Sequence, residues 1–224
     1  MKAVFTCGGT GGHINPALAV ARVLLERRPD SEILFVGAED GMEATLVPRE
    51  GFRLETLQIS SYMRSLKPSA IRHNVRAALS IRRALKKADR IIRDFQPDVI
   101  LGTGGYASYP MLHEGARLGI PTAVHESNAV PGLATKLVAD KVDRILVSFA
   151  DSRSAYRDPS RVIAVGMPVR EEFVFTRRAD ARRALGLDEK TPMIVSAWGS
   201  LGAREMNKKI AQFMKLECEQ DCWR

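Results

Sequence analysis

The chain has 224 residues, 45% of them hydrophobic, and carries a formal net charge of +8. This composition supports a packed core and excludes a disordered chain, and no apolar run reaches the ~20 residues that a membrane-spanning helix needs. The N-terminus joins one lysine to a short apolar stretch, which is too short for a signal peptide and indicates a first strand. A cytoplasmic location is therefore expected.

Apolar runs alternate with helix-like segments along most of the chain. Predicted strands cover residues 4–6, 33–36, 54–59, 99–101, 122–124 and 144–147, and predicted helices cover 16–28, 43–49, 69–94, 110–118 and 131–139. Such an alternation, with each strand a continuous apolar run, predicts an α/β fold: a Rossmann-like parallel sheet with helices on both faces. Ligands of these sheets bind at the carboxyl ends of strands, so functional residues are expected there.

A glycine-rich loop, residues 7–13, joins the first strand to the first helix. Its glycines let backbone amides approach an anion, and a helix N-terminus adds the positive end of its dipole. No Gly-Lys-Ser/Thr follows, which excludes a P-loop, and Ile14 stands where a dinucleotide-binding loop has its third glycine. The loop predicts phosphate or sugar binding by another pattern, with a plain tight turn as the alternative. His13, at its mouth, is a candidate general base.

The predicted helix over residues 69–94 concentrates the positive charge. Between residues 62 and 94, ten Lys or Arg stand against two Asp, so the remainder of the chain is neutral by the same count. Its basic face holds Arg72, Arg76, Arg83, Lys86, Lys87 and Arg90, flanked by Ile71, Val75 and Leu79, and its predicted core face holds Ala78, Ile81, Leu85 and Ile92. Apolar side chains bordered by arginines fit the surface of an anionic membrane leaflet. A solvated basic face over a core helix is the alternative.

Two more loops follow predicted strands. Residues 102–110 form a second glycine loop, and a His-Glu-Ser-Asn cluster at 125–128 supplies a base, a carboxylate and an amide suited to sugar hydroxyls. Metal binding by His125 and Glu126 is disfavoured because adjacent side chains point apart. No metal or cofactor is required by these residues.

The three cysteines form no disulfide framework of the secreted kind. Cys218 and Cys222 lie one helical turn apart and would make half a metal site, but no matching pair follows them. Cys7 is expected to fill a tight turn rather than to act as a nucleophile.

After about Gly166 the pattern begins again. A basic helical stretch at 177–185 precedes a predicted strand at 193–196, a glycine loop at 199–203 and a further helix. This predicts two domains. Residues 1–165 would form the first domain, which carries the basic helix, and residues 166–224 would be a linker and the incomplete start of a second Rossmann-like domain.

Five motifs in order resemble the MurG family of N-acetylglucosaminyltransferases, which have the two-domain GT-B fold. They are GGTGGHINPALAVA at 8–21, GTGGYASYP at 102–110, HESN with PG at 125–132, GMPVR at 166–170 and GSLGA with an asparagine at 199–207. The match is collinear over about residues 2–210. Where family members usually show Asn, Gln, Gly and Gln, this chain has Met167, Ser127, Trp198 and Leu201.

The resemblance implies inverting transfer of N-acetylglucosamine from UDP-N-acetylglucosamine to the 4-hydroxyl of an undecaprenyl-diphosphate-linked muramyl pentapeptide. It implies that residues 1–165 bind the lipid-linked acceptor and the membrane, that the enzyme is peripheral on the cytoplasmic face of the plasma membrane, and that it acts in peptidoglycan synthesis. The implied catalytic residues are His13, Glu126 as alternate base or orienting group, and His125. The implied substrate-binding residues are Thr10, Gly11, Gly12, Gly104, Gly105, Tyr106, Asn128, Arg170 and Ser200.

Three alternatives remain open from the sequence. One is a GT-B transferase that acts on another glycolipid or an antibiotic aglycone. A second is a binding module that recognises the lipid-linked precursor and transfers nothing. Nucleic-acid binding is a third, but the basic helix lacks the interleaved aromatics of a single-strand binder, so no nucleic-acid partner is expected.

Overall fold

The computed structural model describes residues 1–60, 68–198 and 203–220, except for the side chains of 68–76, 78 and 220. The chain divides into two compact units, Met1–Arg170 and Glu171–Arg224. The sequence pattern predicts this division near residue 165.

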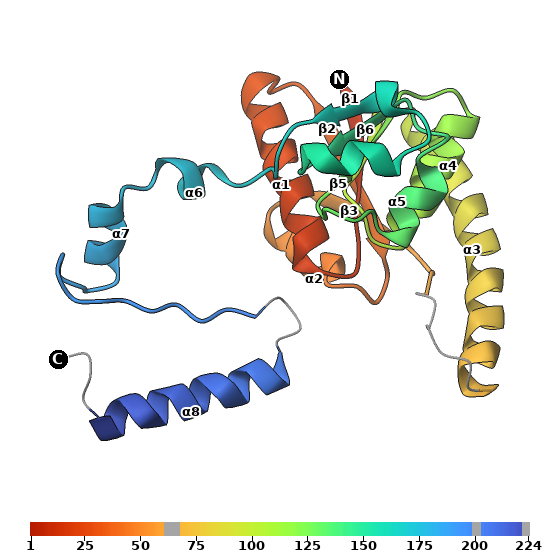
Figure 1. Ribbon diagram of the computed structural model, residues 1–224. Helices are drawn as coiled ribbons and strands as arrows, with labels where there is room; N and C mark the ends of the chain where they lie inside the picture. Colours follow the sequence, from red (N-terminus) through yellow and green to blue (C-terminus); the bar gives the residue numbers. More distant parts are fainter. Residues whose placement is uncertain (61–67, 199–202, 221–224) are drawn as a thin grey trace. The chain divides into compact units, whose positions relative to one another are not determined.

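The larger unit is built on a seven-stranded parallel sheet with the order β3-β2-β1-β4-β5-β6-β7 (Figure 1). The strands are β1 (Lys2–Thr6), β2 (Glu32–Ala38), β3 (Arg53–Leu57), β4 (Val99–Gly102), β5 (Thr122–Glu126), β6 (Arg144–Val147) and β7 (Val162–Ala164). The predicted Rossmann-like sheet is confirmed. Strand order reverses between β1 and β4, and such a switch point leaves a crevice at the strands' carboxyl ends.

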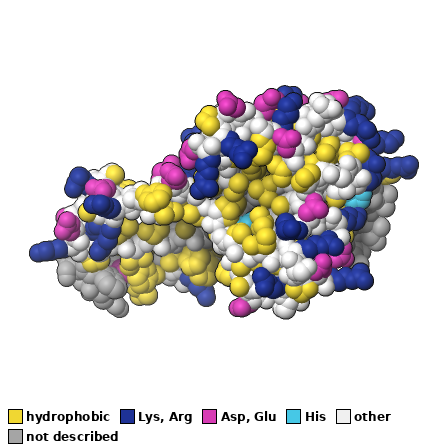
Figure 2. Space-filling view, turned by 90° about the horizontal axis from the view of Figure 1, so that it is seen from above, with side chains coloured by type: hydrophobic (Ala, Val, Ile, Leu, Met, Phe, Trp, Pro, Cys, Tyr) yellow, Lys and Arg dark blue, Asp and Glu magenta, His cyan; other side chains and the backbone are white. Residues whose placement is uncertain are grey.

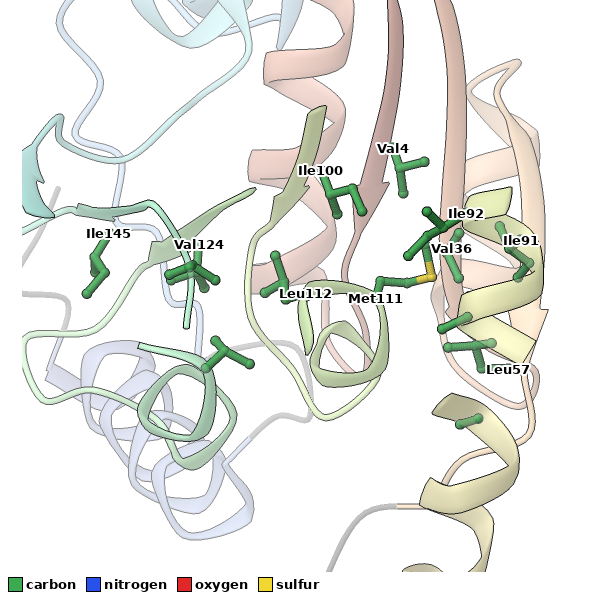
Figure 3. Packing of buried hydrophobic residues seen from close by; sticks show 14 of the residues in the cluster. Val4, Val36, Leu57, Ile91, Ile92, Ile100, Met111, Leu112, Val124 and Ile145 are labelled. Carbon is green, nitrogen blue, oxygen red and sulfur yellow. The ribbon is translucent and has the colours of Figure 1, made fainter. Parts of the chain in front are cut away.

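Helices cover both faces of this sheet (Figure 1). They are α1 (Gly11–Arg27), α2 (Glu43–Arg49), α3 (Pro68–Phe95), α4 (Ser108–Arg117) and α5 (Leu133–Val138), with 3-10 turns at η1 (Ala150–Ala155) and η2 (Pro159–Arg161). Side-chain alternation along β1 divides the core. Val4 packs with the α3–α4–α5 side, whereas Ala3 and Phe5 pack with α1 and α2. Figure 3 shows the first cluster, in which Met111 and Leu112 of α4 reach the sheet.

In the larger unit, three features differ from the predicted elements. Helix α1 begins at Gly11 rather than at residue 16, because Pro16 lies in its opening turns and removes only one hydrogen bond. The core stripe of α3 is Ala77, Ala84, Ala88, Ile91 and Ile92, whereas Ile81 and Leu85 are only half-buried. The alanines of this stripe present little bulk to the sheet. The short strand β7, at the sheet edge, was not predicted.

The smaller unit contains α6 (Glu171–Phe175), α7 (Arg178–Ala184) and α8 (Arg204–Gln220). The strand predicted at 193–196 does not form, because a strand needs a hydrogen-bonding neighbour and no strand occurs in the described part of this unit. Within the described residues, no buried hydrophobic side chain lies beyond Val162. The smaller unit therefore has no apolar core of its own in this part of the chain.

The surface of the larger unit carries both apolar and basic side chains. Figure 2 shows hydrophobic side chains gathered in the middle of one of its faces, with Lys and Arg at the edge. Among the helices in the described ranges, none combines the length and hydropathy needed to cross a bilayer.

Candidate functional site

The two glycine loops meet at the switch point of the sheet. Strands β1 and β4 are neighbours, with Thr6 beside Gly102, so the loops that follow them lie side by side. Gly105 has φ +83°, and a Cβ there would lie 2.0 Å from the carbonyl oxygen of Gly8. Only glycine fits this contact, since any side chain would collide with backbone. The loops therefore form one joined surface at the carboxyl ends of the central strands.

A reciprocal pair of hydrogen bonds holds His13 on this surface. The Thr103 hydroxyl donates to the His13 carbonyl oxygen at 2.6 Å, and His13 Nδ1 lies 3.1 Å from the Thr103 carbonyl oxygen. A carbonyl oxygen can only accept, so Nδ1 carries a proton, and in the neutral ring the lone pair is on Nε2. Thr103 thus fixes the tautomer that a general base needs.

Glu126, at the end of β5, is buried and organises the loop that follows it. Its Oε1 accepts from the Asn128 backbone amide at 2.9 Å and from Asn128 Nδ2 at 2.7 Å, and its Oε2 accepts from the Gly132 amide at 2.9 Å. Burial opposes ionisation of Glu126, but hydrogen bonds from Thr135, Asn128 and Gly132 outweigh it and lower the pKa of this carboxyl. The carboxylate is therefore ionised, and its oxygens are occupied by donors.

These groups border one cavity of about 400 Å³. The residues that line it include His13, Gly104, Gly105, Glu126 and Asn128. The remaining lining residues are Ile59, Ser60, Ile81, Tyr106, Tyr109, Gly132, Leu133, Ala134, Thr135 and Leu137. A cavity of this size, with a few convergent polar groups, is typical of a small-molecule site.

Comparison with known proteins identifies the fold and its relatives. The N-terminal domain model of glycosyltransferase family 28 matches residues 3–147. The chain belongs to glycosyltransferase family 28. A relative from Acetivibrio thermocellus is 40% identical over 96% of this chain, and one from Caldanaerobacter subterraneus is 39% identical over 97%. Both are named UDP-N-acetylglucosamine–N-acetylmuramyl-(pentapeptide) pyrophosphoryl-undecaprenol N-acetylglucosamine transferase, which confirms the resemblance drawn from the motifs.

This family 28 chain spans less than two thirds of those relatives, 57% and 58% of their lengths. Among solved structures, MurG from Acinetobacter baumannii matches with a TM-score of 0.60 at 24% identity, over 75% of this chain and 46% of that one. A UDP-GlcNAc 2-epimerase from Neisseria meningitidis bound to UDP-GlcNAc matches with a TM-score of 0.54 at 16% identity, over 83% and 53%. At these identities the structural matches show a shared fold.

Glu43, which the sequence analysis did not single out, fastens the first glycine loop of this family 28 domain. Its side chain is fully buried, and its carboxylate accepts from the backbone amides of Gly9 at 3.1 Å and Ala38 at 2.7 Å. Burial, followed by the charge of Glu43, raises the pKa of the Cys7 thiol. Cys7 therefore stays protonated and fills space in the turn, as the sequence analysis expected. Burial, with Glu43 and Asp40 nearby, likewise raises the pKa of Tyr106, which remains a neutral phenol.

His125 is not among the residues that line the cavity. It is 1% exposed, and its Nε2 donates to the carbonyl oxygen of Gly166 at 3.0 Å, which ties β5 to the turn after β7. Burial lowers the pKa of this imidazole and keeps it neutral. The geometry gives His125 a structural contact rather than access to a ligand in this cavity.

The other predicted site residues lie in several places. Thr10 is the N-cap of α1, and Gly11 and Gly12 open that helix, outside the cavity lining. Arg170 is exposed at the end of the larger unit, and Ser200 lies outside the described residues. On α3, Leu79 and Arg83 are exposed, whereas the side chains of Ile71, Arg72, Val75 and Arg76 lie outside the described set. In the described part of the chain, no three His, Cys, Asp or Glu side chains gather as a metal site would require.

Proposed function

We propose that this chain supplies the acceptor-binding and base-bearing half of an inverting N-acetylglucosaminyltransferase of peptidoglycan synthesis. The proposed donor is UDP-N-acetylglucosamine, and the proposed acceptor is the 4-hydroxyl of a muramoyl pentapeptide linked through diphosphate to undecaprenol. The observation that carries the proposal is the Thr103–His13 pair, which leaves Nε2 of His13 as a base beside a cavity of sugar-binding size. The names of the relatives supply the substrate class.

The proposed reaction is a single displacement. The acceptor hydroxyl gives its proton to Nε2 of His13 as its oxygen bonds to the anomeric carbon of N-acetylglucosamine, and UDP leaves with the electron pair of the broken bond. The imidazolium that forms is stabilised because its Nδ1–H already donates to the Thr103 carbonyl oxygen. Reach to the hydroxyl is supported by the position of His13 on the cavity wall.

The other predicted site residues are proposed to orient the sugar hydroxyls and to stabilise the negative charge of the diphosphate. Glu126, ionised and fully engaged, orients Asn128 toward the sugar hydroxyls rather than acting as the base. The N-terminus of α1, at Thr10 and Gly11, would offer diphosphate charge the positive end of the helix dipole. Arg170 and Ser200 would bind the donor diphosphate.

The proposed location is the cytoplasmic face of the membrane, with attachment through α3. Its exposed basic residues in the described part are Arg82, Arg83, Lys86, Lys87, Arg90 and Arg93, and Leu79 is 58% exposed beside them. Each basic residue close to an anionic leaflet contributes roughly 1 kcal/mol to binding. This charge supports reversible, salt-sensitive attachment.

Binding without transfer is a second candidate for the isolated chain. One observation favours it: in the described part of the smaller unit no hydrophobic side chain is buried, and Arg170 is exposed at the end of the larger unit. A loosely held diphosphate site gives little transition-state stabilisation.

Turnover separates these candidates. We expect little transfer by the 224-residue chain and normal transfer by a chimaera completed with the remaining part of the Acetivibrio thermocellus relative. In the chimaera, His13→Ala should lower kcat by at least ~100-fold with an unchanged circular dichroism spectrum. Near-normal turnover by that variant would exclude His13 as the base.

A further inference from the structure

The cavity beside His13 is lined by two chemically different sets of residues. One is the polar part, with His13, Glu126 and Asn128. The other consists of Ile59, after β3, Ile81 of α3, Tyr109 of α4, and Leu133 and Leu137 of α5. We call these five residues the apolar wall. They come from four separate parts of the fold and face one space, so the wall is a feature of the tertiary structure.

The apolar wall is unlike an ordinary surface. Leu133 and Leu137 are 53% and 52% exposed, and their i, i+4 spacing places both side chains on the same face of α5. Neighbouring exposed leucines inside a concave site lose contact with water only when an apolar group covers them. A diphosphate in that place would lose hydrogen bonds to water against hydrocarbon, whereas an isoprene unit covers the leucines without burying a polar group.

We propose that the apolar wall binds the first isoprene units of the lipid carrier, directly beside the diphosphate of the acceptor. The inference rests on the proposed function and adds a subsite to it. Its support is continuity: polar part and apolar wall belong to one cavity, and the relatives' names specify pyrophosphoryl-undecaprenol, in which hydrocarbon is bonded to the diphosphate. When the acceptor sugar lies at His13, the lipid that is bonded to its diphosphate is therefore close to the apolar wall of the same cavity.

The proposal makes the hydrocarbon a recognised part of the acceptor. About 400 Å³ holds a sugar with the nearest part of a lipid, while the rest of a long carrier remains outside. Ile81 and Leu79 stand two residues apart on α3, which places them on nearly opposite sides of that helix. Ile81 lines the cavity and Leu79 is exposed among basic residues, so prenyl binding and membrane attachment use different side chains.

The test uses the full chain and three soluble probes in titration calorimetry. They are a muramoyl-pentapeptide diphosphate carrying a methyl group, the same diphosphate carrying a geranyl group, and geranyl diphosphate without sugar. Burying a few CH₂ groups of the first isoprene units should make the geranyl acceptor bind at least about tenfold more tightly than the methyl acceptor.

The variant that probes the wall is the double substitution Leu133→Ser and Leu137→Ser. Both side chains are about half-exposed, so the fold should persist, which circular dichroism checks. It should reduce the geranyl preference to about twofold and leave affinity for the methyl acceptor unchanged. Ile163→Ser is the matched control, because Ile163 is 43% exposed in the same unit and does not line the cavity. It should keep the full preference.

The outcomes separate the subsite from the function. Equal affinity of the wild-type chain for the two acceptors would overturn the subsite and leave the proposed function standing. A double variant that loses both acceptors equally would assign the wall to the pentapeptide and overturn the subsite too. If neither acceptor bound, but geranyl diphosphate bound and was lost in the double variant, the subsite would stand and the proposed function would fail.

Discussion

The carboxylate of Glu43 holds the first glycine loop, and replacing it with an amide tests that role. Glu43→Gln keeps the shape of the side chain but turns one of its two acceptor oxygens into an NH₂ group. The native oxygens accept from Gly9 at 3.1 Å and from Ala38 at 2.7 Å. One of these amides must therefore lose its partner and face another donor.

The expected loss follows from the burial of these groups. Glu43 is fully buried, and a hydrogen bond to a charged group contributes about 1.5–3 kcal/mol. We expect Glu43→Gln to lower the free energy of unfolding by about 2–3 kcal/mol. Glu43→Ala leaves the backbone amides of Gly9 and Ala38 without an acceptor and opens a void. It should therefore lower that free energy by about 4–5 kcal/mol.

Urea unfolding followed by far-ultraviolet circular dichroism measures both losses. Glu39→Gln is the control, because Glu39 is an exposed carboxylate just after β2, the strand that ends at Ala38. The free energy of unfolding of this variant should stay within about 0.5 kcal/mol of the wild-type value. Faster hydrogen exchange at the Gly9 amide should accompany the loss in Glu43→Gln. A Glu43→Gln protein as stable as the Glu39→Gln control would show that the carboxylate does not hold the loop.

Two further predictions concern the membrane and the buried histidine. Reversing Arg72, Arg76 and Arg83 to Glu should release the protein from vesicles containing anionic lipid, and added salt should weaken wild-type binding in a sedimentation assay; salt-insensitive binding would contradict the electrostatic account. Burial lowers the pKa of His125 below its usual 6.5. As the pH falls through 6.5, the unfolded chain therefore binds a proton at His125 while the imidazole of the folded chain stays neutral. The contribution of His125 to the free energy of unfolding is therefore complete above pH ~7. It decreases as the pH drops below ~6.5, by up to about 1.4 kcal/mol per pH unit. His125→Gln keeps a donor for the Gly166 carbonyl and should show a smaller difference in urea midpoint between pH 7.5 and pH 5.5 than wild type; an identical difference would refute the assignment.

The sheet and both glycine loops could be predicted because their signals are local. Apolar runs and glycine spacing mark the strands and the turns that follow them, and β1, β2 and β4 lie within two residues of their predicted ends. The failed strand at 193–196 shows the limit of such signals. Its residues have a strand's composition, but a strand also needs a neighbour, and the described part of the smaller unit offers none.

The support of the site could not be predicted in the same way. Thr103 and His13 are 90 residues apart, and they meet only because β4 is the neighbour of β1. Glu43 reads as an ordinary first-turn helix residue, and nothing near it in sequence indicates a buried carboxylate aimed at the amide of Gly9. Both contacts depend on strand order and on loop packing, which residue periodicity does not report.

The acid–base roles that we propose for this site follow from the lone pairs that hydrogen bonds within the fold already occupy. Glu126 has donors on both oxygens and a lowered pKa, so a proton transferred to it would break hydrogen bonds that shape the loop. His125 donates through Nε2 to Gly166 and is absent from the cavity lining. His13 has its proton fixed on Nδ1 by the Thr103 carbonyl oxygen and lies on the cavity wall. Of the three candidates at the strand ends, His13 alone combines a fixed donor on one ring nitrogen with a place at the cavity, and for this reason we propose it as the general base.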